Sequence, residues 1–220
     1  MRKNKAIFIT GTDTHVGKTI ATLVLGTLYK AQGYNVGVMK PVQCAGNDAA
    51  FLKEALNIDD HLMDINPCYA PEPLSPHLAF HRAGKRVNMD RIFRSFARLC
   101  LCHDLLLIEG AGGLMVPLKK NYYNADLIHD LKAEVIIIAR LGLGTINHTL
   151  LTVHQAKAHG LKIKGILFSD TNPNEKSIAE RTNPVEIQRL SKVKVLGTIP
   201  YLKHLSEKEI LRQCKAIPVD

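Results

Sequence analysis

The chain has 220 residues, of which 46% are hydrophobic and 22% charged, a globular composition with a core that needs no metal or disulfide to fold. Its formal net charge of +9 favours anionic ligands such as nucleotides, nucleic acid or a carboxylate substrate. Its cysteines form no C-x-x-C pair and its apolar runs are short, which argues against a zinc site, a signal peptide and a membrane span and favours a cytoplasmic protein.

Apolar runs typical of buried strands alternate along the chain with segments of helical periodicity. The predicted strands are 6–10, 36–40, 105–109, 135–140, 163–169 and 195–199. The predicted helices are 19–31, 48–56, 90–102, 125–131, 146–159 and 177–190. This alternation predicts an α/β protein with a three-layer αβα, P-loop NTPase-like fold and a mostly parallel sheet. No repeat or shift in composition divides the chain, so residues 1–220 are expected to form a single domain. The Pro-rich segment 66–76 is predicted to be a long loop.

The first strand leads into a phosphate-loop motif, GTDTHVGKT, which starts at Gly11. In a strand–turn–helix context such a loop points backbone N–H groups at phosphate oxygens. Lys18 would reach the β- and γ-phosphates, and the Thr19 hydroxyl would ligate Mg²⁺. Gly11 and Gly17 lie one residue further apart than in the common pattern, so Thr12 takes the usual glycine position. A plain turn with a chance Lys-Thr is disfavoured, because the motif follows a strand and opens a helix.

The second predicted strand ends with Lys40, which would lie at the same edge of the sheet as the loop. A cation there can stabilise a phosphoryl or carbamate oxyanion, although a lysine at a strand end is often only solvated. Asp48 follows in a Gly-Asn-Asp turn, where its carboxylate could either cap the next helix or bind a metal ion. The residues alone leave both alternatives open.

The predicted helix 90–102 carries Arg91, Arg94 and Arg98 opposite an apolar stripe. A solvated basic face is favoured over a nucleic-acid site, because no interleaved aromatic residues or recognised motif accompany the arginines. No nucleic-acid partner is therefore expected, and a salt-dependent binding assay would expose one.

Two further motifs follow predicted buried strands. EGAGG begins at Glu109, whose carboxylate could hold Mg²⁺ while the glycines let a ligand approach the backbone. The alternative is a surface glutamate after a plain strand. GLGTINH begins at Gly142 and opens a helix whose N-terminus suits an anion such as a carboxylate, although Thr145 could simply cap it. The ten histidines show no metal-ligand spacing.

Together these motifs resemble the dethiobiotin synthetase family. The matching segments, in family order, are GTDTHVGKT, KPV, EPLSPH, EGAGG with a following Pro-Leu, and LGTINH, and they span roughly residues 6–202. The resemblance implies an enzyme in which 7,8-diaminononanoate reacts with CO₂ or bicarbonate and ATP to give dethiobiotin, ADP and phosphate. It also implies a homodimer with active sites at the subunit interface.

The resemblance assigns roles to individual residues. Lys18 and Lys40 would be catalytic, contacting phosphate and carbamate, and Mg²⁺ would be held by Thr19, Asp48 and Glu109. The nucleotide would contact Thr14, His15, Val16, Gly17, Lys18, Thr19, Ser169 and Pro200. The diamine substrate would contact Thr14, Lys40, Cys44 and Gly112, and its carboxylate would contact Thr145, Ile146 and Asn147 of the neighbouring subunit.

The chain departs from the family pattern at three positions. His15 replaces an acid, Cys44 replaces a Ser or Thr, and Ser169 replaces an Asn that contacts adenine in some members. A serine hydroxyl cannot offer the paired donor and acceptor of an amide, so weaker discrimination between ATP and other nucleoside triphosphates is predicted.

Two other P-loop classes fit the sequence less well. A regulatory or partitioning ATPase would often carry an extra lysine early in the loop, and the stretch from Gly11 to Thr14 has none. A cobalamin-type amidoligase would need a second, glutaminase domain, for which the chain is too short.

Overall fold

The computed structural model describes residues 5–174 and 176–219. Within them, six parallel strands form the main sheet in the order β10-β9-β8-β1-β5-β2. Their bounds are β1 Lys5–Gly11, β2 Val36–Met39, β5 Leu105–Gly113, β8 Glu134–Arg140, β9 Ile163–Ser169 and β10 Val195–Ile199. The predicted three-layer αβα fold with a parallel sheet is confirmed.

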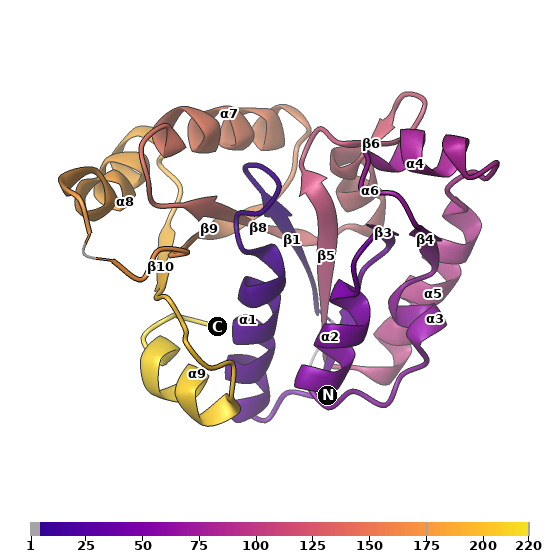
Figure 1. Cartoon of the computed structure of the whole chain (residues 1–220), viewed down its shortest axis with the longest axis horizontal. Helices are drawn as coiled ribbons and strands as arrows, with labels where there is room; N and C mark the ends of the chain where they lie inside the picture. The colour runs from indigo at the N-terminus through magenta and orange to yellow at the C-terminus, as the bar shows by residue number, and fades with distance from the viewer. Residues whose placement is uncertain (1–4, 175, 220) are drawn as a thin grey trace.

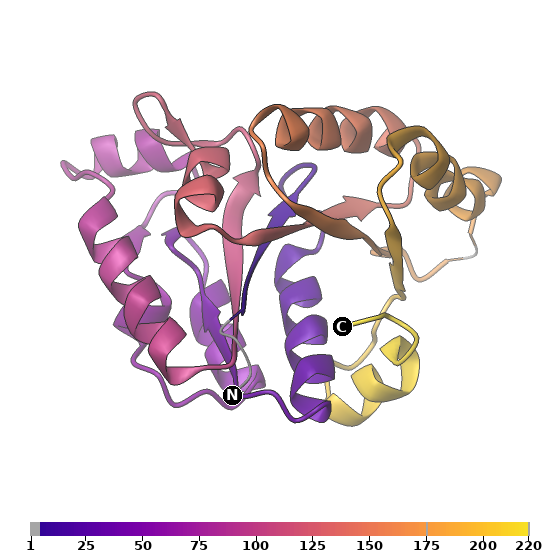
Figure 2. The ribbon, with the colours of Figure 1, turned by 180° about the vertical axis from the view of Figure 1, so that it is seen from behind.

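Helices cover both faces of this sheet (Figures 1 and 2). One face packs against α1 (Lys18–Ala31), α2 (Asp48–Ala55) and α9 (Glu207–Cys214). The other packs against α5 (Met89–Cys102), α6 (Asn124–Leu131), α7 (Thr145–Ala158) and α8 (Ile178–Ser191). In the described part of the chain, none of the helices has both the length and the apolar character needed to cross a membrane.

Two small sheets and two short helices lie near the C-terminal edge of the main sheet. The parallel pair β3 (Val42–Cys44) and β4 (Cys68–Ala70) is joined by α2 and α3 (Leu62–Ile65), and α4 (Pro76–Arg82) follows it. The antiparallel pair β6 (Pro117–Lys119) and β7 (Tyr122–Tyr123) follows β5. The predicted loop 66–76 is therefore wrong in part, because it contains β4 and ends where Pro76 starts α4.

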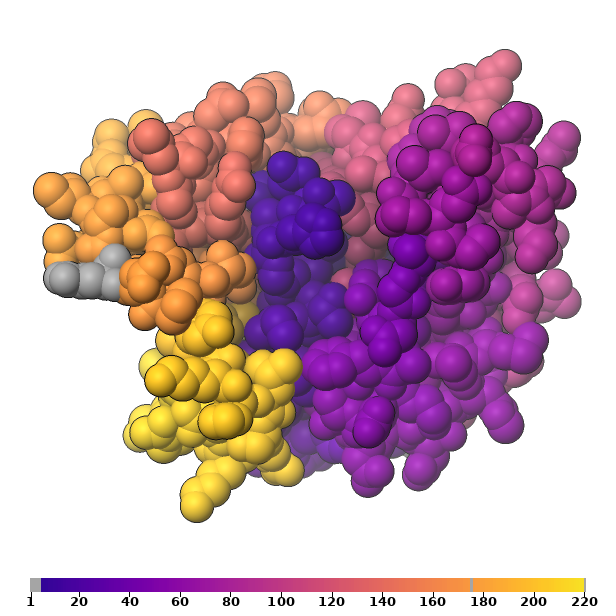
Figure 3. Space-filling model, viewed as in Figure 1, coloured from indigo at the N-terminus to yellow at the C-terminus, as the bar shows by residue number. Residues whose placement is uncertain are grey.

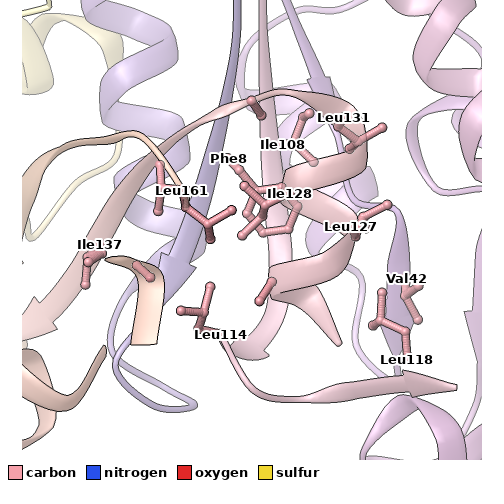
Figure 4. Close-up of a cluster of buried hydrophobic side chains, with 14 of the residues drawn as sticks. Phe8, Val42, Ile108, Leu114, Leu118, Leu127, Ile128, Leu131, Ile137 and Leu161 are labelled. Atoms are coloured by element: carbon pink, nitrogen blue, oxygen red, sulfur yellow. The ribbon is translucent and has the colours of Figure 1, made fainter. Parts of the chain in front are cut away.

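The core is divided by the sheet, because successive side chains of a strand point to opposite faces. In β1, Ile7 and Ile9 pack on the α1 side, whereas Phe8 packs on the α5–α8 side. Figure 4 shows Phe8 beside Ile108 and Ile128 in this second cluster. A Cβ at Gly110 would lie 2.6 Å from the Phe8 ring, so this glycine lets the aromatic side chain pack against β5.

The strand order reverses beside β1. The chain passes from β1 to β2 and then back to β5 on one side, and continues through β8, β9 and β10 on the other. Ligands of open α/β sheets bind where the carboxyl ends of the strands meet such a reversal. The loop after β1 therefore lies at the position where this fold binds its ligands, and Figure 3 shows this indigo segment at the centre of one face.

Candidate active site

The loop between β1 and α1 is shaped by its glycines and by contact with β9. Gly17 precedes α1 with a φ of 91°, in the left-handed region that favours glycine. A Cβ at Gly17 would overlap the Ser169 Oγ and lie 2.9 Å from the Ser169 Cβ. On the other side, the Thr12 N–H donates to the Ile138 carbonyl at 2.9 Å. The loop thus fits closely between two neighbouring strands.

Lys18 begins α1 and folds back over the loop. Its Nζ donates to the Asp13 carbonyl at 2.9 Å, and the residue is only 7% exposed. Burial lowers the pKa of Lys18 from 10.5 to about 8; the carboxylate of Glu109 opposes this shift and the nearby Lys40 adds to it. An anion at this loop would favour the charged form of the lysine.

Four side chains meet beside the loop in a network centred on Glu109. The Lys40 Nζ lies 2.7 Å from the Asp48 Oδ2 and 2.5 Å from the Glu109 Oε1. The Thr19 hydroxyl donates to the same Glu109 oxygen at 2.9 Å. Burial acts to lower the pKa of Lys40, but the charges of Glu109 and Asp48 outweigh it and raise the pKa. Lys40 is therefore fully charged at neutral pH.

This network excludes three of the alternatives that the sequence left open. Asp48 is the first residue of α2, with Asn47 as the N-cap, and its carboxylate binds Lys40, so the capping role proposed for Asp48 is wrong. Glu109 is 1% exposed and lies within β5, which continues to Gly113, so it is not a surface residue after a plain strand. Lys40 is likewise buried and paired rather than solvated.

The same residues offer oxygen ligands for a hard cation. The Glu109 Oε2 is buried and has no hydrogen-bond partner among the described residues. Leaving a carboxylate oxygen unpaired in a dry site is costly, so the position favours a cation. No cluster of three or more His, Cys, Asp and Glu side chains with metal-binding geometry exists in the described residues. Two carboxylates and the Thr19 hydroxyl would instead have to be completed by oxygens of a bound phosphate or water.

A cavity of about 620 Å³ opens beside this network. Ten of the residues predicted to form the site line it, namely Thr14, His15, Gly17, Lys18, Thr19, Lys40, Cys44, Asp48, Glu109 and Gly112. Other lining residues were not among the predicted contacts, for example Gln43, Val116, Thr171 and the segment from Pro73 to Pro76. The last of these lies in the Pro-rich stretch, whose length was a signal of function.

Cys44 is half-buried in the cavity wall, and burial raises the pKa of its thiol to about 11 although Lys40 acts against this. The side chain is therefore a neutral thiol at neutral pH. His15 is exposed at the mouth and has a positive φ of 54°.

The remaining predicted contacts lie outside the cavity wall. Val16 and Ser169 are buried, and Pro200 is half-buried. Gly144, not Thr145, is the N-cap of α7, so the capping role proposed for Thr145 is wrong. The Thr145 hydroxyl is buried and lies 3.4 Å from the Thr149 hydroxyl, whereas Asn147 is exposed.

The phosphate loop at the strand-order reversal, with an acidic residue in the neighbouring strand β5, defines a P-loop protein of the NTPase-like α/β class. The fold resembles a ParA family ATPase from Chlorobium tepidum, with a TM-score of 0.62, 13% identity and coverage of 99% of this chain and 97% of that one. It also resembles the septum site-determining protein MinD complexed with Mg-ADP from Pyrococcus horikoshii, with a TM-score of 0.58, 18% identity and coverage of 98% and 87%. At these identities the likeness shows the fold alone.

Sequence relatives identify the family. A family model described as an AAA domain matches residues 5–209. The chain is 40% identical to the ATP-dependent dethiobiotin synthetase BioD of Thermodesulfovibrio yellowstonii, over 92% of this chain and 91% of the relative. It is 34% identical to the protein of the same name from Nitrosopumilus maritimus, over 94% of each. This chain belongs to the dethiobiotin synthetase family.

Proposed function

We propose that this protein is an ATP-dependent ligase that converts 7,8-diaminononanoate, CO₂ and ATP into dethiobiotin, ADP and phosphate. The observation that carries the proposal is the meeting of Lys18 and Lys40 at one cavity, beside a phosphate loop, in a chain of this family. Two ammonium groups beside a phosphate loop suit the transfer of a phosphoryl group to an anionic acceptor.

The reaction needs charge neutralisation and alignment rather than a nucleophilic side chain. One amine of the substrate adds to CO₂ and loses a proton, which gives a carbamate. A carbamate oxygen attacks the γ-phosphorus, the bond to the bridging oxygen breaks, and ADP leaves. The second amine then attacks the carbamate carbon and loses a proton, the ureido ring closes, and phosphate departs. Lys18 would contact the transferred phosphoryl group and Lys40 the carbamate, and both residues line the cavity.

Mg²⁺ belongs to this proposal as the partner of the nucleotide. The Thr19 hydroxyl and the carboxylates of Asp48 and Glu109 would hold it, and the support is the buried, unpaired Glu109 Oε2. A bound Mg²⁺ supplies positive charge to the β- and γ-phosphate oxygens. Asp48 and Glu109 would then be shared between the metal ion and Lys40.

A homodimer would complete the site. The substrate has two amines at one end and a carboxylate at the other, so it must be held at both ends. In the isolated chain, Thr145, Ile146 and Asn147 are not among the residues that line the cavity. The surface near α7 exposes apolar side chains, with Leu143 89%, Leu151 61% and Met115 43% accessible. A second subunit covering this surface would bury them and bring its own α7 start to the substrate carboxylate.

The fold also favours one alternative, a regulatory ATPase of the partitioning type, because ParA and MinD proteins share it. The early part of the loop, Thr12 to Thr14, contains no lysine, which counts against that class.

Product analysis separates the two functions. The protein is incubated with ATP, Mg²⁺, the diamine and ¹³C-bicarbonate, and the products are analysed by mass spectrometry. We expect dethiobiotin carrying one ¹³C, with phosphate released in equal amount and only when the diamine is present. Lys18→Ala is the matched control. Phosphate release that is indifferent to the diamine, with no labelled product, would support the regulatory ATPase and overturn the ligase.

A further inference from the structure

Lys40 lies outside the strand ladder that would normally hold its backbone. The strand β2 ends at Met39, and its last partner in β5 is Ile108. The backbone of Lys40 is held instead by the end of α3. Its N–H donates to the Ile65 carbonyl at 2.7 Å, and its carbonyl accepts from the Asn66 Nδ2 at 2.7 Å.

The Asn66 amide makes a second bond, to the first residue of β4. The same Nδ2 donates to the Cys68 carbonyl at 3.2 Å, at the first residue of β4. Cys68 is paired with Val42 of β3, two residues beyond Lys40. One amide group therefore links the backbone of Lys40 to the small sheet formed by β3 and β4. Both acceptors are carbonyl oxygens, so the group facing them is the NH₂ of Asn66 rather than its oxygen.

The residues that carry this amide are themselves anchored. Asp64, two residues before Asn66, accepts from the Arg98 Nη1 of α5 at distances of 2.9 and 2.8 Å. The Ser95 hydroxyl of the same helix lies 3.3 Å from the Asp64 Oδ1. These contacts hold the short helix α3 against the long helix α5, and Asn66 is the C-cap residue of α3.

We propose that Asn66 is a positioning residue for Lys40 in the ring-closing reaction, and this inference rests on the proposed function. The Lys40 Nζ must stay close to the Glu109 and Asp48 carboxylates while it faces the reacting carbamate. The backbone of Lys40 lies beyond the last residue pair of β2 and β5. Its N–H is held by the Ile65 carbonyl, and its carbonyl is held by the Asn66 amide. A displacement of about 1 Å at a catalytic group can cost on the order of 10²-fold in rate.

The test compares Asn66→Ala and Asn66→Asp with the wild type. The aspartate keeps the size of the side chain but lacks the N–H donors. For both variants we expect kcat for dethiobiotin formation to fall about 10- to 100-fold. The KM for ATP should change by less than about threefold, because the phosphate loop keeps its own contacts. Asn35→Ala is the matched control. Asn35 precedes β2 at the opposite edge, and its Nδ2 donates to the Cys102 carbonyl at 2.8 Å, so its loss should lower the melting temperature and leave kcat near wild type.

A double-mutant cycle distinguishes positioning from a merely structural role. If Asn66 acts through Lys40, Asn66→Ala should reduce kcat by less than about twofold in a Lys40→Ala background. An equal loss in both backgrounds, or a wild-type kcat in Asn66→Ala, would overturn the inference while leaving the ligase function intact. A wild-type protein that makes no dethiobiotin would instead overturn the proposed function, and the inference would fall with it.

Discussion

Replacing Gly17 by alanine tests how tightly the phosphate loop fits against the sheet. Two separate penalties are expected. First, the residue has a φ of 91°, and a side chain in the left-handed region costs about 1–2 kcal/mol. Second, the new Cβ would overlap the Ser169 Oγ and approach the Ser169 Cβ to 2.9 Å. Since Ser169 is 3% exposed in β9, it has little room to move.

The second penalty is set by overpacking, which typically costs about 1–3 kcal/mol. Together the two effects should lower the free energy of unfolding by roughly 2–5 kcal/mol. In a chain of this length, each kcal/mol lowers the melting temperature by about 2–4 °C. A drop of on the order of 10 °C is therefore expected for Gly17→Ala.

Chemical denaturation of a graded series measures the two penalties separately. Ser169→Gly, combined with Gly17→Ala, removes the overlap and should restore about 1–3 kcal/mol relative to the sum of the single changes. Ser169→Ala removes only the hydroxyl and should restore less. Gly144→Ala is the matched control for strain, because Gly144 has a φ of 89° and its Cβ would meet nothing within 4 Å. It should cost only about 1–2 kcal/mol.

If Gly17→Ala is no more destabilising than Gly144→Ala, the overlap with Ser169 is refuted. Simple additivity of the changes at Gly17 and Ser169 would refute it as well. Either result would mean that the phosphate loop does not pack against Ser169 of β9 as closely as the structure shows.

Four further predictions concern the charged groups and the dimer. Lys18→Ala should lower turnover at saturating ATP by on the order of 10²-fold, and near-normal turnover would remove Lys18 from the mechanism. Since the pKa of Lys18 is lowered to about 8, the affinity for ATP in metal-free buffer, measured by calorimetry, should fall by up to about tenfold per pH unit above that value. In Lys18→Arg the affinity should be almost independent of pH, because the guanidinium stays charged. An identical pH dependence in that variant would show that Lys18 is not the titrating group. Lys40→Met removes the ammonium that lies between the carboxylates of Asp48 and Glu109, so Mg²⁺ titrated into the nucleotide-free protein should bind about tenfold more tightly. Equal or weaker binding would show that Lys40 and Mg²⁺ do not compete for these carboxylates. Mixing inactive Lys18→Ala and Asn147→Ala subunits should restore one intact site in each heterodimer, and confirmed heterodimers without activity would exclude a shared site.

Local motifs explain why so much of the fold could be predicted. The strand into Gly11 and the helix that begins at Lys18 were placed correctly because the loop motif has a fixed context. The meeting of Lys40 and Glu109 followed from parallel strands ending at one edge. The helix α9 was missed, although Ser206 followed by Glu209 is a capping signal ahead of an apolar pair, Ile210 and Cys214.

What could not be predicted depends on register and on contacts distant in sequence. The contact between Ser169 and Gly17 was not predicted, and the expected contact of Ser169 with the nucleotide stays a prediction. No sequence pattern indicates which residue of β9 lies next to Gly17. The sequence could not show whether the Asp48 carboxylate caps α2, because that depended on the position of Lys40, which binds it. The role of Asn66 is likewise invisible in sequence, since its amide acts on a residue 26 positions away.

The edge of the sheet that binds ligands must be irregular and rigid at once. A ladder of strand hydrogen bonds would occupy the backbone groups that ligands approach, yet a loose edge would not hold reacting atoms in line. Three asparagines bind carbonyls at this edge: Asn66 binds those of Lys40 and Cys68, Asn124 those of Ala111 and Gly113, and Asn183 those of Leu141 and Gly142. Each side-chain amide offers two donors and satisfies two carbonyls without adding a charge to the site. The edge can therefore be held in place by neutral amides, while the charges of Lys18, Lys40, Asp48 and Glu109 remain available for ligands.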